Sequence, residues 1–340
     1  MADASDYRPP RWLRNAHLQS ALGSSNARRR IGQARLAASG AVTTEHLVDG
    51  GDGVRLQGLH SARPDGGTAP RGLALLLHGW EGSVESSYMR LTAAQLLADG
   101  FEVFRLNFRD HGDTHHLNEE IFHSCRIDEV VLAATDVARR FPLRPMVVAG
   151  YSLGGNFALR LALRAPAAGL QLAHVAAVCP VLDPARTMDA METGLPFYLW
   201  HFERKWRSSL ARKRALFPQR HDFDDRVLGQ RMRPLTQWLV ERQTDFGTLE
   251  RYFDGYTIAG DRLAGLQVPA SILTAVDDPV IPFDDFERLQ LPASARLEVS
   301  PWGGHCGFIE NARLDGYAEH WIARQLGKPA IAPQPNVGAT

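Results

Sequence analysis

Residues 146–156 read MVVAGYSLGGN, and residues 150–154 within them form a G-x-S-x-G motif centred on Ser152. A serine hydroxyl becomes an effective nucleophile only when it is held exposed beside a base. The motif is typical of a sharp turn from strand to helix, because small residues on both sides of the serine let the chain reverse direction. The pattern therefore predicts that Ser152 is a nucleophile for acyl transfer.

A serine nucleophile needs a histidine base and a carboxylate that orients the histidine, and with this type of turn the chain order is serine, acid, histidine. Asp277 and Asp278 follow one predicted strand, and His305 follows the next, after two glycines. Taken singly, the two aspartates are consistent with a turn or a helix cap, and His305 is consistent with a structural role. Their order and strand-end positions favour catalysis. We choose Asp278 as the acid because it begins the sequence D-P-V-I-P, which matches an acid loop, and Asp277 is the alternative.

The negative charge that develops on the substrate oxygen needs donors fixed in advance. The backbone N–H of Leu153, the residue after the nucleophile, is the first candidate, and that of Trp80, in the strand-to-helix loop HGW, is the second. In this hypothesis His305 takes the proton of Ser152, an acyl-enzyme forms, and water hydrolyses it. We expect His78 to be structural.

The segments around these residues alternate between strand and helix patterns. We expect strands at residues 46–49, 54–59, 73–77, 102–107, 146–149, 174–181, 270–276 and 297–299, and helices at 87–98, 128–140, after Ser152 and near 283–289. This alternation predicts an α/β fold with a mostly parallel, doubly wound sheet. Ligands of such sheets bind beyond the carboxyl ends of the strands, where Ser152 lies.

The strand pattern is interrupted by about 85 mainly helical residues, too many for a simple connection. We therefore predict four parts: an N-terminal arm (1–44), a core (45–182 and 268–326), a helical cap inserted into the core (183–267) and a flexible tail (327–340) rich in proline and small residues.

Composition limits the classes of function. The 340 residues are 44% hydrophobic, enough for a large core, and 38 Lys+Arg balance 38 Asp+Glu, so no overall charge favours nucleic acid. Three scattered cysteines fit a reducing compartment. The start lacks a secretory signal, the run Arg28–Arg30 is followed by no apolar segment of an export signal, and no apolar run approaches the roughly 18 residues of a membrane span. We expect a cytoplasmic protein.

Several further motifs carry a resemblance to a known family. They are residues 9–20 (PPRWLRNAHLQS), 78–83 (HGWEGS), 107–109 (NFR), 122–124 (FHS), 150–156 (GYSLGGN), 277–279 (DDP) and 303–305 (GGH). With them the chain resembles the α/β-hydrolase superfamily and, within it, the YheT-like branch, also called the AB hydrolase 4 family, up to about residue 325. The resemblance implies a hydrolase of acyl esters or lipids with no metal or other cofactor, and a triad of Ser152, Asp278 and His305. The segment Arg109-Asp110-His111 departs from many relatives, which have Arg-Gly and a small residue.

Other functions compete with this interpretation. The segment from Asp110 to His116, with His123 nearby, is dense in metal-ligating residue types and suggests a metal-dependent hydrolase as the alternative. The same triad could pass the acyl group to an acceptor other than water, and a catalytically silent binding protein could keep the fold. Haloalkane dehalogenases and epoxide hydrolases, which resemble this chain in fold, carry aspartate where Ser152 stands, so Ser152 argues against both of these activities.

The predicted cap supplies two further features. It contains ten aromatic residues that we expect to pack the helices and, in part, to line an acyl pocket: Phe197, Tyr198, Trp200, Phe202, Trp206, Trp238, Phe246, Tyr252, Phe253 and Tyr256. Between Arg204 and Arg233, ten Lys+Arg stand against three Asp. This basic stretch is either a solvated face or a surface for transient contact with anionic lipid. We expect a small acyl ester or lipid as substrate and no obligate protein partner.

Overall fold

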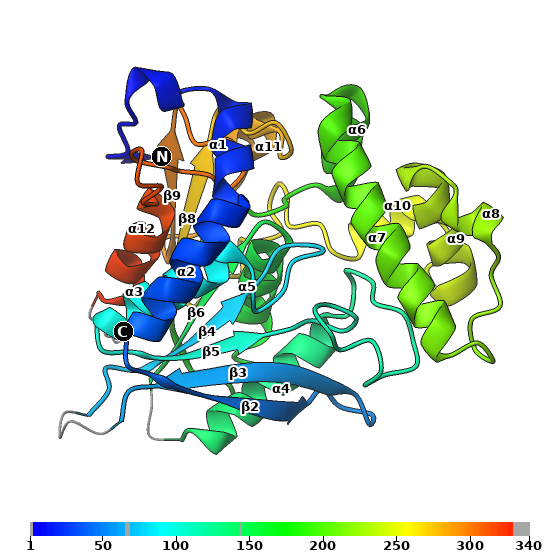
Figure 1. The fold of residues 1–340 in the computed structure, drawn as a ribbon, viewed down its shortest axis with the longest axis horizontal. Coiled ribbons are helices and arrows are strands. Elements are labelled where there is room, and N and C mark those ends of the chain that lie inside the picture. Colours follow the sequence, from blue (N-terminus) through cyan, green and yellow to red (C-terminus); the bar gives the residue numbers. More distant parts are fainter. Residues whose placement is uncertain (1–2, 65–68, 143–144, 329–340) are drawn as a thin grey trace, which may run out of the picture.

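The computed structural model describes residues 3–64, 69–142 and 145–328. Within these ranges a sheet of nine strands forms the centre, in the order β1-β9-β8-β7-β6-β4-β5-β3-β2 (Figure 1). The strands are β1 (Asp3–Ala4), β2 (Val42–Asp49), β3 (Arg55–Ala62), β4 (Leu73–Leu77), β5 (Glu102–Leu106), β6 (Met146–Tyr151), β7 (Leu172–Val178), β8 (Ala270–Ala275) and β9 (Ala295–Ser300). The hairpin of β2 and β3 is antiparallel, and β3 also joins β5 in antiparallel register. All other neighbouring strands are parallel, which confirms the predicted α/β class.

The central strands are apolar because helices cover both of their faces. In β4 all five residues are buried. Leu73, Leu75 and Leu77 belong to the hydrophobic cluster that includes α4 (Ile127–Arg140) and α5 (Leu153–Arg164), whereas Ala74 and Leu76 belong to the cluster that includes α3 (Ser87–Ala98) and α12 (Tyr317–Leu326). Alternate side chains of one strand thus enter two separate core layers.

One group of helices, α6 to α10, stands apart from the other helices of the chain (Figure 1). The helices are the 3-10 helix η1 (Arg11–Leu13) and the α-helices α1 (Ala16–Gly23), α2 (Asn26–Ala38), α3 (Ser87–Ala98), α4 (Ile127–Arg140), α5 (Leu153–Arg164), α6 (Pro184–Thr193), α7 (Pro196–Leu216), α8 (Asp225–Leu228), α9 (Met232–Gln243), α10 (Leu249–Asp254), α11 (Phe283–Glu287) and α12 (Tyr317–Leu326). Helices α6 to α10 follow one another between β7 and β8 and stand together at the right of the sheet in Figure 1. Of the helices in the described ranges, none is both long enough and apolar enough to cross a membrane.

The N-terminal region contains helices that the sequence analysis did not identify. Helix α2 packs along α3, and β1 pairs with β9 at the sheet edge. Helix α2 is rich in arginine, so its apolar periodicity is weak. Its inner face carries Arg28, which is 1% exposed and forms an ion pair with Glu319 of α12 at 2.5 Å. The predicted flexible tail lies outside the described residues from residue 329 onward.

Candidate active site

Ser152 occupies the turn between β6 and α5. Its backbone has φ 54° and ψ −120°, a conformation that residues with a side chain rarely adopt. The Ser152 N–H donates to the carbonyl of Val178 at 2.9 Å, and its carbonyl accepts from the N–H of Asn156 at 3.1 Å. The surrounding structure therefore holds the strained turn from both sides.

The two glycines of the motif are required by close backbone contacts. A Cβ at Gly150 would lie 2.1 Å from the carbonyl oxygen of Gly154. A Cβ at Gly154 would lie 2.3 Å from the carbonyl oxygen of Leu77 and 2.4 Å from that of His78. Helix α5 thus packs against the end of β4 at a distance that only glycine permits.

The structure brings Ser152, His305 and Asp278 into one hydrogen-bonded chain. Ser152 Oγ lies 2.9 Å from His305 Nε2, and His305 Nδ1 lies 2.9 Å from Asp278 Oδ2. The Asp278 side chain is fully buried and that of His305 is 13% exposed. Because a carboxylate only accepts hydrogen bonds, Nδ1 carries the proton, which leaves Nε2 free to accept the serine proton.

The two consecutive aspartates have different partners. Asp278 Oδ1 accepts hydrogen bonds from the N–H groups of Val280 (2.8 Å) and Ile281 (3.0 Å), which fix its carboxylate beside His305. Asp277 instead accepts from the N–H of Gly304 at 2.8 Å. Of the two candidates for the acid, Asp278 is therefore the one in contact with the imidazole.

The electrostatic environment of His305 favours its protonated form. Burial alone lowers the pKa of the imidazole, but the Asp278 carboxylate, the neighbouring Cys306 and the hydrogen bond to Asp278 outweigh burial and raise the pKa to about 9. An imidazole in this setting accepts a proton more readily than a free one.

The loop that carries His305 rests on the N-terminal helix α1. Gly304 has φ 53°, and a Cβ there would lie 2.2 Å from the carbonyl oxygen of Ala16. The Oγ of Ser20 accepts a hydrogen bond from the backbone N–H of His305 at 2.8 Å. Ser20 lies in the family motif at residues 9–20, yet nothing in its residue type indicated this contact.

Gln19 of α1 also forms hydrogen bonds to the segment that follows His305. Its Oε1 accepts from the N–H of Ile309 at 2.7 Å, and its Nε2 donates to the carbonyls of Leu13 (2.7 Å) and Ile309 (3.2 Å). Gln19 is completely buried. Helix α1 is therefore part of the support of His305.

The two backbone donors predicted for the oxyanion lie at the same cavity as Ser152. Leu153 is the first residue of α5, and the first N–H groups of a helix have no partner within it. Trp80 follows Gly79, whose N–H donates to Tyr88 Oη at 2.9 Å and whose Cβ, if present, would lie 3.4 Å from Ser152 Cβ. The loop of Trp80 thus passes directly beside the serine.

His78 is a buried structural residue, as expected. Its Nδ1 donates to the carbonyl of Gly79 at 2.8 Å, and its Nε2 accepts from the N–H of Phe108 at 3.2 Å. Burial, together with the charges of His111 and Lys205, holds the pKa of His78 well below its ordinary value.

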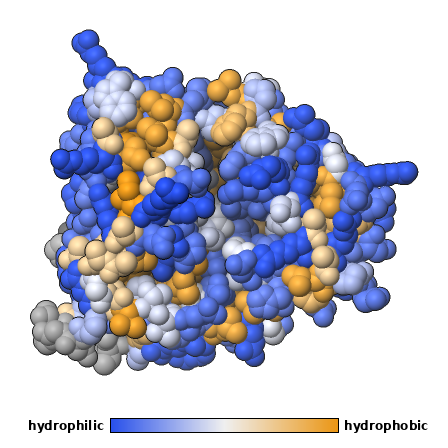
Figure 2. All heavy atoms as spheres, viewed as in Figure 1, coloured by the Kyte–Doolittle hydropathy of each residue, from blue (hydrophilic) through white to orange (hydrophobic). Residues whose placement is uncertain are grey.

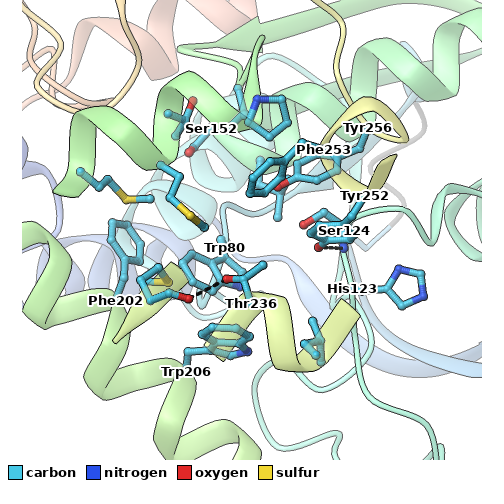
Figure 3. Close-up of a pocket in the computed structure, with 18 of the residues that line it drawn as sticks. Trp80, His123, Ser124, Ser152, Phe202, Trp206, Thr236, Tyr252, Phe253 and Tyr256 are labelled. Atoms are coloured by element: carbon cyan, nitrogen blue, oxygen red, sulfur yellow. Dashed lines mark hydrogen bonds between the residues drawn. The ribbon is translucent and has the colours of Figure 1, made fainter. Parts of the chain in front are cut away.

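A mainly apolar cavity of about 90 Å³ opens beside Ser152, between the core and helices α6 to α10 (Figure 3). Of the ten aromatic residues singled out in the sequence, five line it: Phe202, Trp206, Tyr252, Phe253 and Tyr256. Trp80 stacks on Phe202, with ring centroids 5.4 Å apart. Phe197 and Trp200 are instead more than half exposed.

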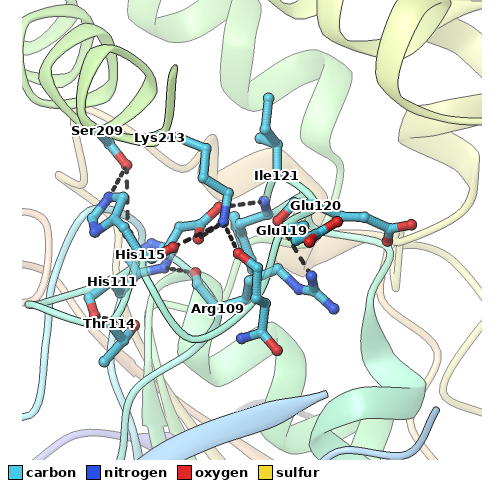
Figure 4. A network of polar contacts seen from close by, with 12 residues as sticks. Arg109, His111, Thr114, His115, Glu119, Glu120, Ile121, Ser209 and Lys213 are labelled. Atoms are coloured by element: carbon cyan, nitrogen blue, oxygen red, sulfur yellow. Dashed lines mark hydrogen bonds and ion pairs between the residues drawn. The ribbon is translucent and has the colours of Figure 1, made fainter. Parts of the chain in front are cut away.

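The histidine-rich segment after Arg109 anchors helix α7 (Figure 4). The buried Lys213 Nζ of α7 binds Asp110 Oδ1 at 2.7 Å and the carbonyl of His115 at 3.1 Å. His115 Nε2 lies 2.8 Å from the hydroxyl of Ser209. Across the described part of the chain, no three His, Cys, Asp or Glu side chains are grouped to hold a metal ion.

Most of the basic stretch from Arg204 to Arg233 is paired with carboxylates. The ion pairs are Arg207–Glu203, Arg212–Asp113, Lys213–Asp110, Arg214–Asp225, Arg220–Glu120, Arg231–Glu203 and Arg233 with Asp189 and Glu192. The excess of positive charge in the sequence is therefore largely neutralised by acids from outside the stretch.

Comparison with known proteins agrees with this architecture. The family model described as "alpha/beta hydrolase fold" matches residues 75–312. The chain is 24% identical to the putative esterase YheT of Escherichia coli over 260 residues, covering 74% of each protein, and 25% identical to the putative esterase slr0264 of Synechocystis over 296 residues, covering 78% and 77%. A diacylglycerol lipase of Xenopus laevis, ABHD11, is 29% identical over 146 residues, which cover 42% of this chain and 43% of the lipase.

Solved structures share the fold. The Pyrococcus furiosus esterase Pf2001 is 16% identical and superposes with a TM-score of 0.55, covering 85% of this chain and 89% of that one. A bacterial membrane phospholipase A is 19% identical with a TM-score of 0.51, covering 87% and 89%. Its similarity to YheT and slr0264 agrees with the resemblance to the YheT-like branch, and with the family match spanning most of the chain, this protein belongs to the α/β-hydrolase family.

Proposed function

We propose that this protein is a serine hydrolase that cleaves carboxylic esters through an acyl-enzyme on Ser152. The observation that carries the proposal is the continuous hydrogen-bonded chain from Ser152 Oγ through the His305 imidazole to the Asp278 carboxylate, with 2.9 Å at each step. This arrangement has the geometry that nucleophilic catalysis by serine requires.

In the acylation step, Ser152 Oγ attacks the ester carbonyl carbon while its proton passes to His305 Nε2. Asp278 stabilises the imidazolium that results. The carbonyl oxygen becomes an oxyanion and accepts hydrogen bonds from the N–H groups of Leu153 and Trp80. When the intermediate collapses, the C–O bond to the alcohol breaks, the alcohol takes the proton from His305, and the acyl group stays on Ser152.

In the deacylation step, water attacks the acyl carbon and gives a proton to His305. The second intermediate collapses with cleavage of the bond to Ser152 Oγ, which recovers its proton from His305. The products are a carboxylic acid and the free enzyme. The two steps together consume one ester and one water molecule and yield one alcohol and one carboxylic acid.

The apolar cavity beside Ser152 is suited to bind the acyl group of the substrate. Met188, Met191 and Leu239 line it together with the aromatic residues, and an apolar lining of this kind favours an aliphatic chain. The printed names of the relatives, putative esterases and a diacylglycerol lipase, agree with an acyl ester as substrate class.

The test is hydrolysis of p-nitrophenyl butyrate by the wild type and by Ser152→Ala. We expect kcat to fall by about 10⁴ to 10⁶, with circular dichroism unchanged. The matched control is Ser124→Ala, which removes another hydroxyl from the lining of the same cavity and should cost less than about tenfold. Equal turnover in the wild type and Ser152→Ala would refute the proposal.

A further inference from the structure

A second cavity, of about 530 Å³, lies between the core and helix α7. Residues from the segments 81–86 and 110–115 of the core line it together with residues of α2, α3 and α7. Its volume falls within the range of about 300–1,000 Å³ that small-molecule sites occupy. In Figure 2 the centre of the visible face is hollowed, and mostly hydrophilic residues border the hollow.

Helix α7 separates this cavity from the catalytic one. Phe202 and Trp206 of α7 line the catalytic cavity, whereas Arg204 and Lys205 line the second. Lys205 Nζ also donates to the carbonyl of Glu81, next to Trp80, at 3.0 Å. The second cavity therefore has its own lining and does not belong to the site of Ser152.

Basic side chains dominate the charged lining. Five cationic residues contribute to it: Arg29, Arg90, Arg204, Lys205 and Arg212. Two of them already have acidic partners, since Arg90 pairs with Glu85, and Arg212 pairs with Asp113 at 2.8 Å. The other three cations are Arg29, Arg204 and Lys205.

Arg29, Arg204 and Lys205 have no carboxylate within ion-pair distance among the residues that the structure describes. The guanidinium of Arg204 lies 5.5 Å from the centre of the Trp200 ring, a contact that leaves its N–H donors free. Burial lowers the pKa of Lys205, the Glu81 carboxyl group opposes this shift, and the positive charges of Arg29 and Arg204 lower the pKa further. These three cations repel one another, so an anion between them would be stabilised.

The acidic residues of the lining do not neutralise the three cations. Asp110 is already bound to Lys213 at 2.7 Å. Burial raises the pKa of Glu81 to about 8, so that its carboxyl is mainly protonated at pH 7. The cavity therefore keeps a net positive charge at neutral pH.

Hydroxyl groups complete the lining. Ser83, Ser86, Ser208 and Ser209 face the cavity, and residues 83–86 lead directly into the N-terminus of α3. Hydroxyls and the positive end of a helix are both common partners of phosphate.

We propose that this cavity binds the phosphate group of an organic phosphate ester, with Arg29, Arg204 and Lys205 as its cationic ligands. Clustered guanidinium and ammonium groups match the charge and the several oxygens of phosphate better than those of a single carboxylate. The cavity is larger than a bare phosphate ion, so the organic part of the ligand fills the remainder. The proposal does not depend on the role of Ser152.

The test is isothermal titration calorimetry with Ser152→Ala protein and three probes: inorganic phosphate, sn-glycerol 3-phosphate, and dihexanoyl phosphatidic acid, which adds two acyl chains to the second probe. We compare the further double substitution Arg29→Gln/Arg204→Gln with the matched control Arg30→Gln/Arg226→Gln. The control removes two exposed arginines, one from α2 and one from α8, that do not line the cavity.

We expect at least one organic phosphate to bind, with an affinity that falls by more than tenfold in the first double variant and by less than threefold in the control. Binding of glycerol 3-phosphate identifies a free phosphate ester as the ligand, and binding of the lipid probe alone identifies a phospholipid headgroup. No binding of either organic probe at millimolar concentration, or equal weakening in both double variants, would overturn the proposal.

Discussion

Asp277 and Asp278 are adjacent in the chain, but their carboxylates bind different partners. Asp278 contacts His305, whereas Asp277 accepts from the backbone of the loop that carries this histidine. The pattern D-P-V-I-P pointed to Asp278, and the geometry agrees because the N–H groups of Val280 and Ile281 fix that carboxylate. A sequence pattern could point to the aspartate that contacts His305 because the N–H groups that fix its carboxylate are local.

The raised pKa of His305 predicts the pH dependence of activity. The base must be neutral to take the serine proton, so kcat/KM is lost as pH falls through the pKa of about 9. We expect kcat/KM of the wild type to rise by about tenfold per unit from pH 6 to 8. The measurement is a pH profile with p-nitrophenyl butyrate.

Asp278→Asn checks the cause of this pKa. Without the carboxylate, the imidazole should titrate at lower pH, as followed by histidine NMR signals, and kcat should fall by about 10⁴. Asp277→Asn, the adjacent control, removes a carboxylate that does not touch His305 and should move the titration less. A wild-type acid limb at or below pH 6.5 would contradict the assignment.

Ser20 is predicted to act as a positioning residue. Ser20→Ala removes the acceptor of the His305 N–H, so we expect kcat to fall by about tenfold, equivalent to ~1.4 kcal/mol. KM should stay unchanged because Ser20 does not line the catalytic cavity, and Ser20→Thr should restore kcat. A change in thermal stability alone, with kcat intact, would reduce Ser20 to a packing role.

At the scale of elements, helix α7 is joined to the core by a buried ion pair. Lys213 and Asp110 are each almost fully buried, and Asp110 also accepts from the N–H of Phe122 at 2.9 Å. This finding gives the segment from Asp110 to His116 a structural explanation. Polar residues of this segment, whose types suggested metal ligands, instead contact α7 and the local backbone.

Removal of one partner of this pair should be costly. Lys213→Met leaves the charge of Asp110 buried and unpaired, so we expect the free energy of unfolding to fall by about 3–5 kcal/mol. In Lys213→Met/Asp110→Asn the unpaired charge is absent and much of the loss should be recovered. Urea denaturation measures both. A double variant no more stable than Lys213→Met alone would contradict this view.

The strands were more predictable from sequence than the N-terminal helices. Strands such as β4 and β6 are continuous apolar runs, because both faces are buried, and they were located to within a few residues. Helices α1 and α2 carry no comparable apolar stripe. Their inner faces are held by hydrogen bonds and an ion pair to distant segments, among them Gln19 to Ile309 and Arg28 to Glu319. Pairing across some 290 residues leaves no local signal.

At the scale of the whole molecule, the catalytic cavity lies between two parts of the chain. The sequence predicted a helical insertion with aromatic residues, but it could not show which of them face Ser152. Trp206 lines the cavity, whereas Trp200, on the same helix, is 54% exposed. Only the packing of α7 on the core distinguishes them.

This difference predicts how chain-length preference can be changed. Trp206→Ala enlarges the cavity, so the optimum of kcat/KM over p-nitrophenyl esters from acetate to dodecanoate should move to longer chains, with a gain of about tenfold for the longest relative to butyrate. Trp200→Ala is the control and should keep the wild-type preference. Identical chain-length profiles for the two variants would show that the acyl chain does not bind in the cavity lined by Trp206.

The central claim is that Ser152 is the nucleophile, activated by His305 and Asp278. Its most direct test is covalent labelling with a fluorophosphonate, followed by mass spectrometry of the labelled peptide. The account predicts one adduct, on Ser152, whose formation slows by at least about 10³ in His305→Ala, in which the base is absent. An adduct on another serine, or labelling of Ser152 at an equal rate in His305→Ala, would contradict it.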